Sequence, residues 1–218
     1  MIAIKIIVLF LFSEWIERLK YMKKYSIDTR FNVYRSLLCI YFTIYSLELV
    51  VNNFSDAYNV NFNYTNKNIL NMQDMLLAYL LLDIVKLIDM KNKRWDLYFH
   101  HISTIIALLI IKYYDKFSYI SILCIITEAI SICSGFDMMY LEDNNKYESM
   151  LCKKYRKNII QYVRLPIWIL IIIMVLINKN NVPPLLFWTG LSFPIILIFL
   201  DQYWRNRCQK IIDNYEKN

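Results

Sequence analysis

Long apolar runs separated by short polar segments dominate this chain, and their lengths predict its secondary structure. Most runs approach the roughly 20 residues that an α-helix needs to cross a bilayer. Membrane-spanning helices are expected at residues 33–51, 72–90, 96–113, 117–136, 162–177 and 182–204. An earlier apolar segment, residues 2–19, is followed by no small-residue cleavage site, so it is expected to be an uncleaved anchor helix rather than a signal peptide.

Composition agrees with an all-α, polytopic membrane protein. The hydrophobic fraction of 58% is too high for a soluble globular domain, and 2 Gly leave no material for phosphate-cradling loops. The net charge of +7 does not predict nucleic-acid binding, because the basic residues lie between apolar runs. The predicted organisation is an anchor helix and basic linker at 1–29, a helical domain at 30–205 and a cytosolic tail at 206–218.

Cysteine and histidine usage argues against a disulfide framework and against a bound metal. The 5 Cys include no CxxC spacing, which disfavours disulfides and a zinc ribbon. The 2 His are adjacent, at His100 and His101, whereas membrane di-iron enzymes need several spaced histidines. No metal or resident cofactor is therefore expected.

The distribution of Lys and Arg predicts the orientation in the membrane. Basic residues are concentrated after the first, third and fifth apolar segments and in the C-terminal tail, which all lie on one side. The positive-inside rule makes that side cytosolic, with the N-terminus lumenal if the first segment spans. Two glycosylation sequons, Asn53-Phe-Ser and Asn63-Tyr-Thr, fall on the opposite, lumenal side, within residues 52–71.

Several ionisable residues are predicted to lie within the membrane, all in its cytosolic third. An isolated charge there costs roughly 2.5–3.5 kcal/mol on insertion scales, so a shared polar cavity open to the cytosol is the expected arrangement. The residues, from five different segments, are Asp83, Lys86, His100, His101, Glu128, Arg164 and Asp201.

The histidine pair is the expected centre of this cavity. Neighbouring residues of a helix point about 100° apart, so only one of His100 and His101 is expected to face the middle of the cavity. Asp83 or Glu128 is expected within hydrogen-bond reach of it. Helical spacing places Thr104 on the face of the histidines, Tyr79 on that of Asp83 and Ser131 on that of Glu128.

Simpler roles are open for most of these groups. The two histidines could lie in headgroup water, and Asp83 could form a local ion pair with Lys86. Arg164 could extend to the interface and bind lipid phosphate. Glu128 is the deepest of the set and has no basic neighbour on its own segment, which favours a functional role.

Four short motifs, in order on four predicted helices, resemble the TLC domain, the family that includes the Lag-type ceramide synthases. They are Ala78-Tyr-Leu-Leu-Leu-Asp83, His100-His101-Ile-Ser-Thr104, Glu128-Ala-Ile-Ser131 and Arg164-Leu-Pro166, and the resemblance covers about residues 30–205. It implies a six-helix core around a cavity, an endoplasmic-reticulum or related endomembrane, and a role with lipids, sphingolipids among them.

The resemblance is closer to the small TLC-domain proteins than to the ceramide synthases. Those enzymes continue from the first histidine motif to a His-Asp-x-x-Asp pattern, where this chain has Thr127-Glu128 and then Ser131. The expected function is therefore binding of lipid or acyl chains with an effect on membrane lipid composition. The alternatives are N-acyl transfer from acyl-CoA to a long-chain base and, less favoured, a lipid or cargo transporter or receptor.

Both lipid hypotheses use the same residues. In the acyltransferase hypothesis the catalytic groups are a histidine acting as general base or nucleophile and a carboxylate that orients it. Their candidates are His100, His101, Glu128 and Asp83. The residues expected to bind lipid or acyl-CoA are Thr104, Ser131, Arg164, Tyr79 and Lys86.

Overall fold

A computed structural model of the chain describes residues 2–54, 66–89 and 94–217. Every element of regular structure within those ranges is helical, which confirms the all-α class. In chain order, with η for short 3-10 or π segments, the elements are α1 (Ile2–Arg18), η1 (Lys20–Lys24), α2 (Ile27–Asn52), α4 (Lys67–Asp89), α5 (Trp95–Tyr114), α6 (Ser118–Ile126), η2 (Thr127–Ser131), α7 (Ile132–Glu142), α8 (Lys146–Ile159), η3 (Ile160–Arg164), α9 (Leu165–Ile177), η4 (Lys179–Asn181) and α10 (Pro184–Glu216).

Within the described residues, six helical stretches are long and apolar enough to cross a membrane. Each overlaps one of the expected spans from residue 33 onward, so the chain is an integral membrane protein by length and composition. They are Ile27–Asn52, Lys67–Ile88, Trp95–Tyr114, Ser118–Glu142, Lys146–Ile177 and Pro184–Glu216. The helix α1 is not among the six; it lies beside α4, where Lys5 Nζ donates to the Asn71 carbonyl at 2.9 Å.

The expected spans at 117–136 and 162–177 leave residues 137–161 as a charged connection between them, and this interpretation is wrong. The helix α7 continues to Glu142, and Lys146–Ile177 forms one helical stretch through α8, η3 and α9. Lys, Arg and Glu are good helix formers in water, so these helices continue beyond the apolar layer. Most of the expected tail at 206–218 is likewise part of α10, which extends to Glu216. Polar composition indicates where lipid contact ends rather than where a helix ends.

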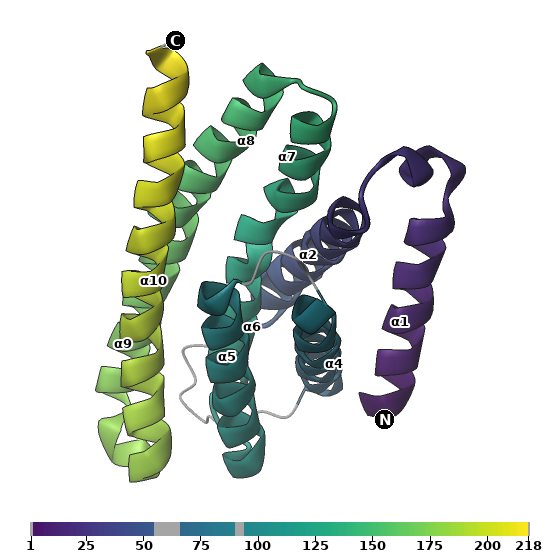
Figure 1. Cartoon of the computed structure of the whole chain (residues 1–218). Helices are drawn as coiled ribbons and strands as arrows, with labels where there is room; N and C mark the ends of the chain where they lie inside the picture. The colour runs from purple at the N-terminus through teal and green to yellow at the C-terminus, as the bar shows by residue number, and fades with distance from the viewer. Residues whose placement is uncertain (1, 55–65, 90–93, 218) are drawn as a thin grey trace.

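The helices form one bundle in which α6 and α7 run through the middle. Figure 1 shows α10 with α8 and α9 along one side of these helices, and α1 on the far opposite side beyond α2 and α4. The helices α2 and α7 cross closely at Gly135. A Cβ added to Gly135 would lie 2.5 Å from the Val33 Cα, and the Gly135 N–H donates to Ser36 Oγ at 2.8 Å. The absence of a side chain therefore sets the spacing of these two helices.

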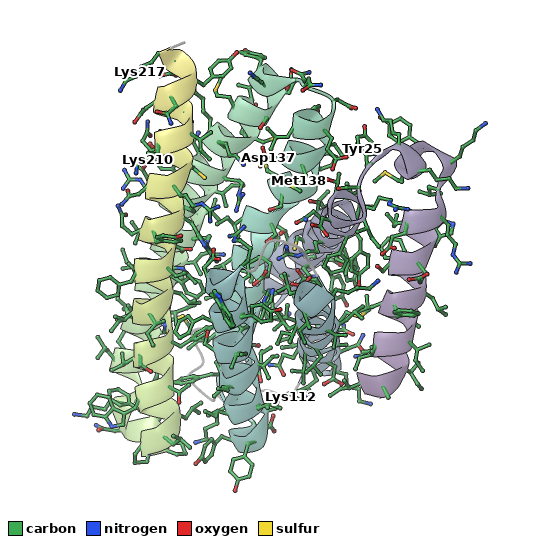
Figure 2. All side chains as sticks on the ribbon, viewed as in Figure 1. Tyr25, Lys112, Asp137, Met138, Lys210 and Lys217 are labelled. Atoms are coloured by element: carbon green, nitrogen blue, oxygen red, sulfur yellow. The ribbon has the colours of Figure 1, made fainter. Side chains whose placement is uncertain are left out.

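The two ends of the bundle differ in charge. Figure 2 shows Lys210, Lys217, Asp137 and Tyr25 toward one end, which we call the basic end, and Lys112 at the other. The basic segment η1, the start of α8 and the end of α10, which the positive-inside rule assigns to the cytosol, lie toward the basic end (Figure 1). Between the ends, large apolar side chains are exposed, including Ile44, Ile106, Ile173 and Phe199. Such an apolar belt is the surface that lipid covers.

Of the two sequon asparagines, the structure describes Asn53. The Asn53 side-chain amide donates to the Leu49 carbonyl at 2.6 Å, and its oxygen accepts from Asn66 at 3.0 Å. Asn53 is therefore buried and bonded to its own helix end. The sequon at Asn63 lies outside the described residues.

Candidate functional site

His101 contacts a carboxylate of the neighbouring helix α4. Its Nε2 lies 2.5 Å from Asp83 Oδ2, and both side chains are buried. The other Asp83 oxygen forms an ion pair with Arg35 of α2, whose Nε is 3.0 Å away, at an angle that is not that of a hydrogen bond. An ionised carboxylate can only accept, so the facing His101 nitrogen carries the proton. Three helices thus hold the ring, and Arg35 balances the buried carboxylate.

His100 has a separate carboxylate partner, Glu128 of η2. Its Nε2 lies 3.2 Å from Glu128 Oε1, and the side chains are 3% and 4% exposed. The two histidine rings are 5.3 Å apart, and the His100 ring is edge-on to Trp204 of α10 at 5.7 Å. Among the described residues, neither His100 Nδ1 nor His101 Nδ1 has a hydrogen-bond partner. With Nε2 protonated toward the carboxylate, each neutral Nδ1 has a free lone pair.

The expected contact between the histidines and the carboxylates is confirmed, with one correction. Both histidines point into the bundle, so the expectation that only one does is wrong, as is placement in headgroup water. The reason is the position of α5, which packs against α4, α6 and α10. Directions 100° apart on α5 therefore both face interior neighbours. The sequence predicted that one carboxylate, Asp83 or Glu128, would contact a histidine. In the structure each of the two contacts its own histidine.

Arg164 is fully buried, so the alternative that it extends to the interface is wrong. Its Nε donates to both oxygens of Asp201 of α10 at 2.9 Å, and it also bonds the Thr127 carbonyl of η2. Trp168 Nε1 donates to Asp201 at 2.9 Å. Arg164 ends the π segment η3, and one extra residue per turn changes which way a helix presents its side chains. Arg164 therefore ties α9, α10 and η2 together behind Glu128.

Of the other residues expected to bind lipid, three lie beside the histidines or line the polar cavity, and Lys86 does not. Thr104 Oγ1 donates to the His100 carbonyl at 2.7 Å, and the buried Tyr79 ring is edge-on to His101 at 6.3 Å. Ser131 lines the polar cavity described below. Lys86 lies apart from the histidines, because its Nζ forms ion pairs with Glu17 at 3.3 Å and Glu14 at 3.7 Å. Lys86 therefore links α4 to α1, and no Asp83–Lys86 pair forms.

Two cavities meet at His100. A polar cavity of about 840 Å³ lies toward the basic end between α2, α5, α7, α8 and α10, and both histidines line it. An apolar pocket lies deeper between α5, α6, α9 and α10, where Thr104, Glu128, Trp168 and Leu197 are among its lining residues. Its free volume is about 30 Å³, so it is a narrow slot. His100 is the histidine that lines both.

Sequence reasoning missed several residues of this site. Arg35, within the expected span at 33–51 but not counted among its ionisable residues, is 4% exposed and pairs with Asp83. Trp204, placed at the end of a span, donates from its ring N–H to Asp96 at 2.7 Å, and its ring packs against that of His100. Arg156 of α8, also placed in a connection, lines the polar cavity. The sequence does contain a signal for Arg156: it lies three residues after Lys153, so the two share one helix face, and both line the cavity.

In the described part of the chain, no group of three or more His, Cys, Asp or Glu side chains could hold a metal ion. All five cysteines are free thiols. Comparison with known proteins gives no match: no protein-family model, no curated protein and no solved structure matches this chain. Function must therefore be inferred from the site itself.

Proposed function

We propose that this chain is an endomembrane protein of the TLC type that binds an amphiphilic lipid and influences membrane lipid composition. One observation carries the proposal: the His100–Glu128 pair lies where the apolar pocket meets the polar cavity. An amphiphile has the same two-part chemistry, an apolar chain and a polar head. If the apolar chain of the lipid occupied the apolar pocket and its head group the polar cavity, the bond between chain and head group would lie next to His100.

The lining of the apolar pocket supports a chain as its occupant. Apart from His100, Glu128 and a few hydroxyl or thiol groups, its walls are aliphatic and aromatic, including Leu197, Phe193 and Ile171. Burial of each chain methylene contributes about 0.8 kcal/mol. At about 30 Å³ the slot must widen for a chain to enter, which needs rotamer changes of these side chains.

Charge supports a head group rather than water alone as the occupant of the polar cavity. The cavity is lined by cations from α2, α8, α10 and the residue before α5, Arg35, Arg94, Arg156 and Arg207 among them. It lies toward the basic end, which the positive-inside rule assigns to the cytosol. A soluble or bilayer-borne head group would therefore reach His100 from the cytosolic side.

Acyl transfer is the second candidate, and the two histidine–carboxylate pairs favour it. Glu128 holds His100 with Nδ1 free, the arrangement that a general base needs. In this hypothesis Nδ1 takes a proton from an amine, the amine nitrogen attacks the thioester carbonyl of acyl-CoA, and the thiolate leaves with that proton. The bond formed is an amide, and the bond broken is the thioester.

A photoreactive lipid tests the binding proposal. A single-chain amphiphile with a diazirine near the chain end, incubated with the purified protein in nanodiscs, is expected to label residues of the apolar pocket such as Phe193 and Leu197. Ser131→Phe, which fills the polar cavity, should reduce the labelling. Ile173→Phe, on the exposed face of α9, is the matched control and should leave it unchanged. Labelling confined to lipid-facing residues such as Ile173 would contradict the proposal.

The same preparation separates binder from enzyme. Glu128→Gln keeps an oxygen acceptor for His100 but removes the negative charge that stabilises a developing imidazolium. A binder should tolerate the change. An acyltransferase should lose about 10²-fold in amide formation from acyl-CoA and a long-chain amine, measured by mass spectrometry, while chain labelling is retained.

A further inference from the structure

We infer that the polar cavity binds a phosphate monoester, held between Arg156 of α8 and Arg207 of α10, as the head of the bound amphiphile. That the ligand has an acyl chain rests on the proposed function. That its head is a phosphate monoester rests on the residues that line the polar cavity. It concerns two side chains that contribute nothing to the histidine pairs.

Arg156 and Arg207 are the cations of the cavity lining whose charge is not balanced by a carboxylate partner among the described residues. Three of its cations already have a carboxylate: Arg35 pairs with Asp83, Arg94 with Asp96 and Lys153 with Asp137. Within the described residues, neither Arg156 nor Arg207 has a carboxylate within ion-pair distance, although both line the cavity. A guanidinium cannot lose its proton in a protein, so two positive charges remain.

Arg156 carries the more specific signal. Its Nε is shielded from solvent and has no hydrogen-bond partner among the described residues. A buried charged donor without an acceptor is unfavourable, and an acceptor supplied by a ligand would remove that penalty. The nearest acid along the cavity wall, Asp137, is already engaged by Lys153 and by Ser149, whose hydroxyl donates to it at 2.7 Å.

The remaining acid of the cavity lies on another wall. Asp28 of α2 lines the cavity and forms no ion pair within the described part of the chain. Figure 1 shows α2 on one side of α7, with α8 and α10 together on the other. The uncompensated positive charge is therefore on the α8–α10 side, and an anion there is separated from the Asp28 carboxylate.

The class of anion follows from charge and geometry. A phosphate monoester carries about −1.5 to −2 at neutral pH, which matches two guanidinium groups. Its oxygens also fit the fork of each guanidinium, as they fit bidentate arginine contacts in general. A carboxylate carries one charge, and the choline head of a phosphodiester lipid brings a cation that these arginines would repel.

Four ligands that share one chain length test the phosphate. Lysophosphatidic acid carries the phosphate monoester, lysophosphatidylcholine carries a diester with a cation, monoacylglycerol carries no phosphate, and palmitoyl-coenzyme A carries its phosphates on a soluble head. Their binding to the full chain in nanodiscs of neutral lipid is measured by competition with labelled lysophosphatidic acid. We expect lysophosphatidic acid to bind at least tenfold more tightly than lysophosphatidylcholine or monoacylglycerol.

The arginines have matched controls on the same helices. Arg156→Gln and Arg207→Gln should each weaken lysophosphatidic acid binding about tenfold or more, the loss expected for one charge-assisted contact. Lys157→Gln on α8 and Arg205→Gln on α10 should leave it unchanged, because these side chains do not line the cavity. A melting temperature within the range of the controls confirms that the variants are folded.

Each outcome bears on the inference separately from the proposed function. Equal binding of all four ligands, or no effect of Arg156→Gln and Arg207→Gln, overturns the phosphate site even if the photoreactive lipid still labels the apolar pocket. Arginine-dependent binding without chain labelling supports the phosphate site and overturns the proposed function. Preference for palmitoyl-coenzyme A, or competition by inorganic phosphate alone, supports the phosphate chemistry and assigns it to a soluble source rather than a lipid head.

Discussion

His100 and His101 are adjacent on α5, yet the carboxylates that they contact depend on them differently. Asp83 keeps its ion pair with Arg35 whatever happens to His101. Among the described residues, Glu128 has one hydrogen-bond donor to its side chain, the His100 ring. Arg164 lies nearby but is bonded to Asp201 and the Thr127 carbonyl. A buried carboxylate left without a donor is far less stable than one that keeps a charged partner.

The two histidine deletions should therefore differ in stability. His100→Ala leaves Glu128 buried without a donor and should lower the free energy of unfolding by about 2–4 kcal/mol. His101→Ala removes a similar ring but leaves Asp83 paired, and should lower it by about half as much. Urea titration of the two variants in detergent, followed by tryptophan fluorescence, measures the difference. Equal losses would show that Glu128 does not depend on His100.

At the scale of elements, the contact of α2 with α7 fixes the wall behind the histidines. Arg35 and Ser36 lie on α2, and Ser36 Oγ both accepts from the Gly135 N–H and donates to the Ser131 carbonyl at 3.1 Å. Ser131 ends η2, the segment that carries Glu128. The close crossing thus positions Arg35 on one side and Glu128 on the other.

A methyl group at this crossing should separate the helices. Gly135→Ala places a Cβ 2.5 Å from the Val33 Cα, a backbone atom that cannot rotate away, and should cost about 1–3 kcal/mol or more. Gly190→Ala is the control, because its nearest neighbour is a Val175 methyl at 3.0 Å, which can adjust. Melting temperatures of the two variants should fall in that order. A Gly135→Ala protein as stable as Gly190→Ala would contradict the packing.

A polar contact at the basic end gives a pH dependence. Asp143 accepts from Lys24 at 2.9 Å and from Tyr25 at 2.7 Å, and these hydrogen bonds hold the pKa of its carboxyl below the ordinary 3.8. The pKa of Tyr25 is raised to about 12, mainly by burial, so its hydroxyl stays a donor throughout the acidic and neutral range. A lowered carboxyl pKa means that this stabilisation is present above about pH 4 and is lost as the pH falls through the lowered value.

The contribution of Asp143 should accordingly vanish in acid. At pH 6 the wild-type chain is expected to melt at a higher temperature than Asp143→Asn, because the amide lacks the charge that attracts Lys24. The difference should shrink toward zero between pH 4 and pH 2. Melting curves of both proteins across pH 6 to 2 measure it. A difference that persists unchanged at pH 2 would mean that the carboxylate is not its source.

At the scale of the whole molecule, consecutive apolar stretches run back and forth through the bundle, so their ends lie in two sets (Figure 1). The set at the basic end includes the start of α8, with Lys146 and Lys153, and the end of α10, with Arg207 and Lys210. The opposite end has few cations, and Lys112 there is paired with Asp74. The polar cavity lies toward the basic end, so the orientation of the chain decides which compartment supplies its ligand.

We predict that the basic end faces the cytosol. The charge asymmetry motivates this orientation through the positive-inside rule. A glycosylation reporter fused after Asn218 should remain unmodified in cells, whereas the same reporter inserted next to Asn66, at the opposite end, should acquire a glycan. Modification of the C-terminal reporter alone would invert the orientation and place the cavity toward the lumen.

The sequence alone determined the helical class, the approximate positions of the spans and most of the buried polar groups, although it missed Arg35. Apolar length is a local property, and the cost of a charge in hydrocarbon limits where Asp83, Glu128 and the histidines can lie. It also indicated that carboxylates and histidines share one depth, because rise per residue is constant along a helix. It misplaced helix ends, since charged residues continue a helix outside lipid as readily as they end it.

Only the tertiary structure decided which groups are partners. Sequence spacing describes one helix face, whereas Arg35 reaches Asp83 and Arg164 reaches Asp201 across helix contacts set by packing. Lys86 shows the same limit: it lies three residues from Asp83 on α4 but pairs with Glu17 of α1. Pairing across a bundle depends on helix rotation and spacing, which arise from many distant contacts together. No local pattern contains that information, and so the division of two carboxylates between two histidines emerged only from the fold.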